Sequence, residues 1–139
     1  MMRHTRPQLV NALINHPDIR PTMERGEHRI DSTEVVENLN NVVFASEHGV
    51  IVFLYKGEGV YEGHIGLLAA CRGKQGLKLA GEALDRLFGQ YNARKVTSAI
   101  PNALPQAKMF VRRLGFTSEG VAEDKPVENF VMEARRWAV

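Results

Sequence analysis

Apolar and polar positions alternate with a strand-like period in the middle of the chain. From Val42 to Cys71 the sequence is rich in β-branched and aromatic residues, and two glycine-containing turns interrupt it. Short runs of this kind between glycine turns are typical of strands. The pattern predicts a three-stranded meander over Val42–Glu47, Val50–Lys56 and Val60–Cys71. The third run is the most apolar at its far end, so we expect a central strand buried on both faces.

Helical spacing flanks this meander. Behind it, apolar side chains recur three and four residues apart, on one face of a helix. These side chains are Ala80, Ala83, Leu84, Leu87, Phe88 and Tyr91.

Similar spacing predicts helices at Pro7–His16 and Ala107–Leu114, the second ended by Gly115. Further strands are expected at Ala93–Ile100, Phe116–Val121 and Glu128–Trp137, the last placing Phe130 and Trp137 in the core.

The polar segment Asp18–Asn41 predicts a loop with one short helix or edge strand. Its acidic residues Glu24, Glu27 and Asp31 could draw a cationic ligand, although a solvated acidic loop explains them equally well.

The expected order of elements is a helix, three strands, a helix, a strand, a helix and two strands. This order is typical of an α/β protein (α+β in some schemes) built as a three-layer sandwich. Its sheet is mixed and mostly antiparallel, with flanking helices. At 139 residues and 44% hydrophobic content, the chain can bury one core, so we expect a single domain over residues 1–139.

Composition restricts the cellular compartment and the kinds of partner that we expect for this protein. A single cysteine, Cys71, excludes an intrachain disulfide and fits a reducing compartment. No apolar run approaches the roughly 20 residues of a membrane span, and the N-terminus has no signal-peptide core. We expect a cytoplasmic protein without a membrane partner. A net charge of +2 is low for a nucleic-acid binder, and the five histidines show no metal-ligand spacing, so neither nucleic acid nor metal is expected.

The stretch AACRGKQGLKLA (Ala69–Ala80) joins the third predicted strand to a helix. The first N–H groups of a helix lack partners and the helix dipole is positive there, so such a turn attracts anions. Arg72 could bind a phosphate through two hydrogen bonds. The spacing matches neither the Walker loop nor the GxGxxG dinucleotide fingerprint. Taken alone, the turn fits phosphate binding or an ordinary solvated turn.

In its context this turn resembles a known loop. The meander, the turn and the later stretch VTSAIPNALPQAKMFVRRLGFTSEG are together similar to the GNAT N-acetyltransferase superfamily. The pyrophosphate loop of that family reads Arg or Gln, two variable residues, Gly, one variable residue, then Gly or Ala. Arg72–Leu77 occupies its place, with Gln75 at the first glycine position and Gly76 one residue late. The resemblance covers about Val42–Trp137 and extends to a diverged branch that bacteriophages carry.

The resemblance implies a cofactor, acetyl-CoA. The loop N–H groups would hold its pyrophosphate, and its pantetheine arm would pair like an extra strand with the end of the third predicted strand. Many members carry an asparagine early in the helix that precedes the GF pair, at the position where this chain has Pro105. Asn102, three residues upstream, would take its place. The implied cofactor-binding residues are Leu67, Leu68, Ala69, Arg72, Gly73, Lys74, Gln75, Gly76, Leu77 and Asn102.

Two residues of the third predicted strand are candidates for catalysis. Glu62 and His64 lie two residues apart, so they share one face of the strand. Either could accept the proton that an attacking amine must lose. A hydrogen-bonded or exposed pair without a catalytic role explains them as well. Many family members carry a tyrosine as general acid four residues before the glycine of the GF pair, in the later predicted helix Ala107–Leu114. Here that position is Val111, which has no proton to donate.

The resemblance implies an N-acetyltransferase that moves acetyl from acetyl-CoA to an unidentified primary amine by direct attack. The acceptor would be a small molecule or a peptide, and a homodimer is an expected assembly. The alternative is a catalytically inactive GNAT-fold assembly or interaction protein, for example in phage morphogenesis, which Gln75, Pro105 and Val111 favour. A basic nucleic-acid-associated module is a third, weaker hypothesis.

Overall fold

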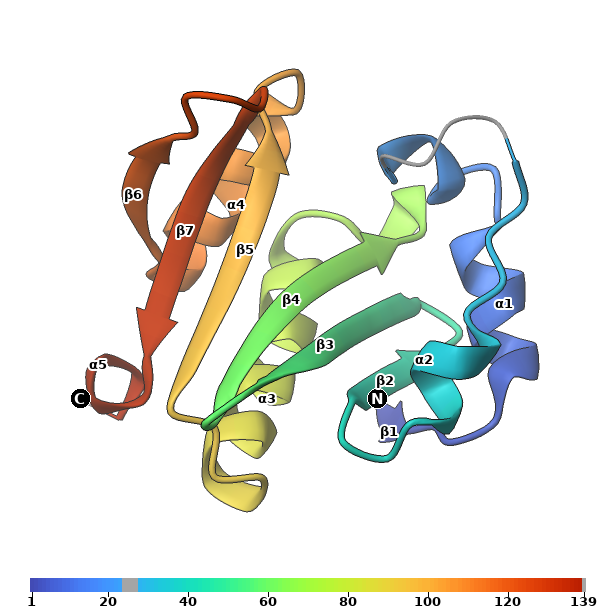
Figure 1. The fold of residues 1–139 in the computed structure, drawn as a ribbon. Helices are drawn as coiled ribbons and strands as arrows, with labels where there is room; N and C mark the ends of the chain where they lie inside the picture. The colour runs from blue at the N-terminus through green and yellow to red at the C-terminus, as the bar shows by residue number, and fades with distance from the viewer. Residues whose placement is uncertain (24–27, 139) are drawn as a thin grey trace.

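A seven-stranded sheet runs through the molecule and carries helices on both faces (Figure 1). The computed structural model describes residues 1–23 and 28–138. Only β4 and β5 are parallel neighbours, and the other pairs are antiparallel, as predicted. In spatial order the strands are β1 (Met2–Arg3), β2 (Val42–Ser46), β3 (Gly49–Gly57), β4 (Val60–Leu67), β5 (Lys95–Pro101), β7 (Val127–Glu133) and β6 (Thr117–Val121).

Two apolar clusters bind the helices to the sheet. On one face, α3 (Lys74–Gln90) and α4 (Pro105–Leu114) cover a cluster that includes Phe44 and Phe130. On the other face, α1 (Pro7–Ile14) and α2 (Thr33–Glu37) cover a cluster that includes Val43. Successive side chains of a strand point to opposite faces, so β2 supplies both clusters. The predicted three-layer arrangement is therefore confirmed. Within the described ranges, no helix is long and apolar enough to cross a membrane.

The third strand is shorter and less buried than the sequence predicted. β4 ends at Leu67, and Ala69–Cys71 forms a short 3-10 helix. The reason is the partner strand, because β3 begins at Gly49, the residue that pairs with Leu67. β4 is central in the sheet as expected, but its side chains at Glu62 and His64 remain 33% and 40% exposed.

The last predicted strand also extends too far. β7 stops at Glu133, where its ladder with β5 ends, and the chain turns into α5 (Ala134–Trp137). Phe130 is fully buried, as predicted. Trp137 lies on α5 instead of the strand and is only partly buried. Its indole packs on Phe88 and donates a hydrogen bond of 2.7 Å to Asp85.

The N-terminal part contains the expected short helix, α2, and a 3-10 turn at Arg20–Thr22. The edge strand β1 was missed because two residues show no alternation. Of the acidic residues noted in this segment, Glu24 and Glu27 lie outside the described residues. Asp31 accepts hydrogen bonds from the N–H and hydroxyl groups of Thr33.

Candidate active site

β4 and β5 diverge in the middle of the sheet (Figure 1). They pair over three positions only, Val60–Glu62 with Lys95–Thr97. Beyond this point β4 follows β3 to Leu67, while β5 follows β7 to Pro101. The hydroxyl of Ser98 donates to the carbonyl of Gly63 (3.3 Å), where the ladder stops. An opening therefore separates the carboxyl ends of two parallel strands.

Backbone groups of β4 face this opening. The Leu68 N–H donates to the His48 carbonyl (3.0 Å), so Leu68 turns its backbone toward β3. Hydrogen-bonded and non-hydrogen-bonded pairs alternate along an antiparallel ladder. Leu67 and Ile65 therefore turn their N–H and C=O groups toward β5, which has moved away. Among the three residues expected to pair with pantetheine, Leu67 alone presents its backbone to the opening, and Ile65 is a further candidate.

The start of α3 leaves backbone N–H groups unpaired among the described residues. Gly73 precedes α3 with a φ of +88°, a conformation that favours glycine. The first helical hydrogen bond runs from the Leu77 N–H to the Gly73 carbonyl (3.0 Å). The N–H groups of Lys74, Gln75 and Gly76 have no acceptor within the described part of the chain. Together with the helix dipole, they make this turn suited to an anion.

Gly76 has a packing role that its sequence pattern did not reveal. A Cβ there would lie 2.5 Å from Cδ1 of Leu67 and 3.1 Å from the carbonyl oxygen of Cys71. α3 therefore approaches the end of β4 so closely that a side chain at this position would have to displace Leu67 and press on the Cys71 carbonyl. This contact sets the position of the first turn of α3 relative to the strand.

Two of the predicted cofactor ligands have partners within the protein. Arg72 is exposed, and its Nη2 donates to the Asp18 carbonyl (2.7 Å). Asn102 accepts a hydrogen bond from Nζ of Lys108 (2.8 Å), which also pairs with Glu128 (3.0 Å). Arg72 keeps further N–H donors, because a guanidinium has five. The amide oxygen of Asn102 is held toward α4 and β7.

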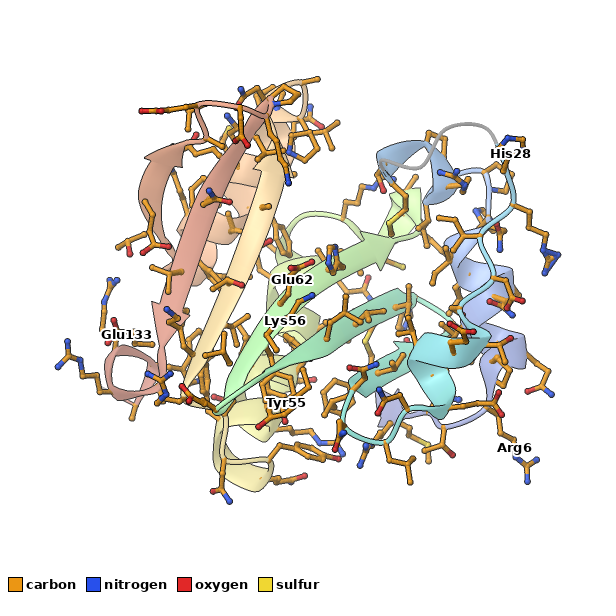
Figure 2. The ribbon with its side chains drawn as sticks, in the orientation of Figure 1. Arg6, His28, Tyr55, Lys56, Glu62 and Glu133 are labelled. Atoms are coloured by element: carbon orange, nitrogen blue, oxygen red, sulfur yellow. The ribbon has the colours of Figure 1, made fainter. Side chains whose placement is uncertain are left out.

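Glu62 and His64 are brought together on one face of β4, as predicted. Nε2 of His64 lies 2.7 Å from Oε1 of Glu62, and Nζ of Lys56 lies 3.7 Å from Oε2 (Figure 2). Burial raises the pKa of Glu62, but the hydrogen bond and charge of His64 and the charge of Lys56 outweigh it and lower the pKa below its usual value. An ionised Glu62 accepts a hydrogen bond from Nε2–H of His64, so in the neutral imidazole Nδ1 carries the free lone pair.

The structure also joins two residues that the sequence left apart. Nδ1 of His48 lies 3.3 Å from Sγ of Cys71, and its Nε2 lies 3.6 Å from a carboxylate oxygen of Glu47. Cys71 is buried. This contact links the β2–β3 turn to the turn after β4. His48 and Cys71 are 23 positions apart, so no local sequence pattern predicted their contact. The register of β3 on β4 brings them together.

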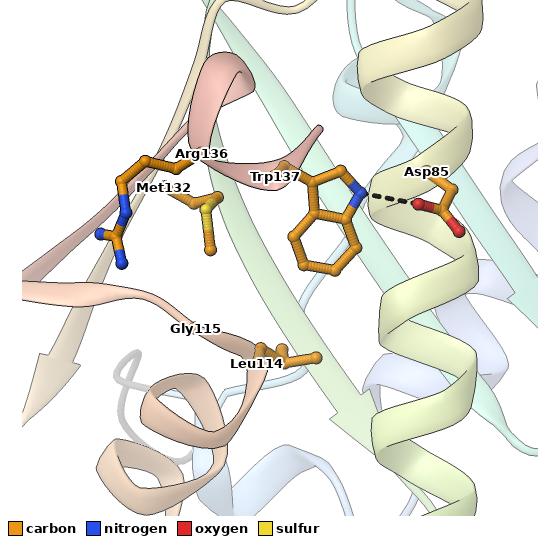
Figure 3. A pocket seen from close by; sticks show the side chains of 6 residues that line it. All are labelled: Asp85, Leu114, Gly115, Met132, Arg136 and Trp137. Atoms are coloured by element: carbon orange, nitrogen blue, oxygen red, sulfur yellow. Dashed lines mark hydrogen bonds between the residues drawn. The ribbon is translucent and has the colours of Figure 1, made fainter. Parts of the chain in front are cut away.

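Two cavities lie elsewhere. One, of about 330 Å³, is lined by Asp85, Trp137 and Met132, between α3, β7 and α5 (Figure 3). The other, of about 400 Å³, lies beside Tyr61 and Tyr91. Neither is lined by Glu62, His64 or the first turn of α3. The candidate site is therefore defined by the divergence of β4 and β5 and not by a closed cavity.

The mixed sheet with its diverging strands has the fold of the GNAT N-acetyltransferases, as the sequence predicted. A spermidine N-acetyltransferase from Vibrio cholerae, solved in complex with CoA and spermine, superposes with a TM-score of 0.73 at 17% identity over 94% of this chain and 90% of that one. A chimera of the Vibrio cholerae enzyme and hSSAT gives a TM-score of 0.75 at 17% identity, covering 93% and 90%. No protein-family model and no curated protein sequence matches the chain.

Proposed function

We propose that this protein is an N-acetyltransferase that moves acetyl from acetyl-CoA to a primary amine. The observation that carries the proposal is the coincidence of two features at the end of β4. The strand diverges from β5 there, and the next helix presents unpaired N–H groups. The fold supports the same function, since a neighbour of that fold was solved with CoA and spermine.

The cofactor would lie across these two features. The N–H groups of Gly73–Gly76 and the free donors of Arg72 would hold the pyrophosphate. The backbone of Leu67 and Ile65 would pair with the amides of the pantetheine arm, in place of the missing β5 neighbour. When bound, acetyl-CoA supplies an activated thioester. No side chain has to form a covalent bond for the amine to attack it directly.

The pair on β4 would handle the proton of the amine. Nδ1 of His64 takes the proton, and the Glu62 carboxylate stabilises the imidazolium that results. An N–H group of β4 facing the opening would polarise the thioester carbonyl. Val111 is buried and has no proton to donate, so the departing CoA thiolate would take its proton from solvent. An aliphatic polyamine is the first acceptor to test, because the neighbour's complex contains spermine.

Thermal unfolding with acetyl-CoA, CoA and ATP in parallel tests this function. A ligand specific for the folded state adds about 2.7 kcal/mol at a hundredfold excess over its Kd. We expect a rise in Tm with both CoA ligands and none with ATP, followed by turnover of an amine panel. No shift with either CoA ligand would contradict the proposal.

A binding protein without turnover is the second candidate. Val111 in place of a general acid favours it, and so does Gln75 at a glycine position of the loop. Such a protein would show the same rise in Tm with CoA. It would then transfer no acetyl group to any primary amine across the panel, including spermidine and spermine.

A further inference from the structure

The segment between α1 and the first 3-10 turn is held against the end of β4. Ile19 is fully buried and lies over Gly66. A Cβ at Gly66 would be 2.5 Å from Cγ2 of Ile19, so only glycine allows this contact. The residue before Ile19 is Asp18, which this packing places beside the turn that leads into α3.

Asp18 makes three polar contacts from this position. Its carboxylate oxygen Oδ2 accepts a hydrogen bond from the Ala69 N–H (2.9 Å). Its carbonyl accepts a hydrogen bond from Nη2 of Arg72 (2.7 Å). Its own N–H donates to Nδ1 of His16 (3.0 Å). One residue of the N-terminal segment thus contacts the turn both at its start and at its end.

We propose that Asp18 is a positioning residue of the cofactor site. Its carboxylate fixes the turn between β4 and α3, and its carbonyl orients the Arg72 guanidinium. This inference rests on the proposed function, because it assigns the ordered turn to the binding of the CoA pyrophosphate.

The turn is short, and two hydrogen bonds from backbone N–H groups hold its start. Leu68 donates to the His48 carbonyl on one side, and Ala69 donates to Asp18 on the other. Because the carbonyl of Cys71 packs against Gly76, a displaced turn would also displace the start of α3. Without the Asp18 carboxylate, the cost of ordering the turn falls on ligand binding and weakens it.

The charge of Asp18 acts in the opposite direction. A carboxylate near a phosphate repels it, so loss of the charge alone would tighten binding. An Asp18→Asn substitution removes the charge and keeps an oxygen acceptor for the Ala69 N–H. An Asp18→Ala substitution removes both. The two variants therefore separate positioning from repulsion.

The test is the Kd of CoA by calorimetry for wild type, Asp18→Ala and Asp18→Asn. We expect Asp18→Ala to raise the Kd about tenfold or more, the usual effect of losing a hydrogen bond to a charged group. Asp18→Asn should bind CoA as tightly as wild type or more tightly. Asp31→Ala is the matched control and should leave the Kd unchanged, since the described residues that bond its side chain, Thr33 and Asn11, lie outside the turn between β4 and α3.

Hydrogen exchange of the backbone separates this inference from the proposed function. The Ala69 N–H should lose protection in Asp18→Ala and keep it in Asp18→Asn, whether or not CoA is present. Equal exchange in all variants, or a Kd for Asp18→Ala at or below that of wild type, overturns the inference. A wild type that binds no CoA contradicts the proposed function, and the exchange data then still decide whether Asp18 orders the turn.

Discussion

The starts of α3 and α4 follow the two diverging strands, yet the polar groups beside them have different partners. At α3, Gly73 has a φ of +88°, and the next N–H groups have no acceptor within the described residues. At α4, Pro105 has no N–H group, and Lys108 bonds both the amide oxygen of Asn102 and the buried carboxylate of Glu128. This difference supports the proposal that the start of α3 binds a ligand, whereas side chains near the start of α4 join that helix to β7.

The proposed proton transfer involves residues of β4 and neither helix start. We therefore expect the largest effect on turnover from a substitution on β4. His64→Ala should lower kcat by about 10²–10⁴-fold, the usual contribution of a general base. The Kd of CoA should stay within twofold of wild type, because no expected CoA contact is lost. Steady-state kinetics and calorimetry together check this. A kcat close to that of wild type would remove His64 from the mechanism.

The next effect is on stability at the α3 side. Gly76→Val should lower the free energy of unfolding by about 1–3 kcal/mol, because the added atoms overlap Leu67 and the Cys71 carbonyl. Urea denaturation measures this loss. Gly81→Val is the control in the same helix, since a Cβ at Gly81 meets nothing within 4 Å. Equal losses in both variants would mean that the close approach of α3 to β4 does not govern stability.

Two arginines allow the comparison to be made directly. Arg72→Ala should raise the Kd of CoA about tenfold, since a charged donor to the phosphate is lost. Arg112→Ala should leave that Kd unchanged and lower Tm, because Nη2 of Arg112 bonds Glu128 (3.0 Å) and its guanidinium lies over Phe130. The opposite pattern would reverse the roles assigned to the start of α3 and to the contacts of α4 with β7.

The smallest expected effect is on the pH dependence of stability, through Glu128 beside α4. The hydrogen bond from Ser118 and the contacts of Lys108 lower the pKa of Glu128 below its usual value. A carboxyl group with a lowered folded pKa adds stability above its unfolded pKa, and this stability is lost as pH falls through the folded value. Glu128→Gln should therefore melt below wild type at neutral pH and approach it in acid. A difference in Tm that is constant with pH would contradict this role for the carboxylate.

Local pattern was enough to predict the meander, the two long helices and the glycine turn before α3. Their periods of 2 and 3.6 depend only on neighbouring residues. The same pattern placed Glu62 and His64 on one face of β4, where they form a hydrogen bond. The predicted ends of β4 and β7 were wrong, because the true ends depend on where the partner strands stop, which a local pattern does not contain.

The sequence by itself determined the elements, their order and the resemblance to an acetyltransferase loop. Tertiary structure decided which β4 residues face the opening, how closely position 76 packs against Leu67 and Cys71, and that Asp18 bonds Ala69, 51 positions away. These are consequences of strand register and close packing between distant segments. Such contacts leave no periodic signal along the chain, because each depends on where another part of the protein comes to lie.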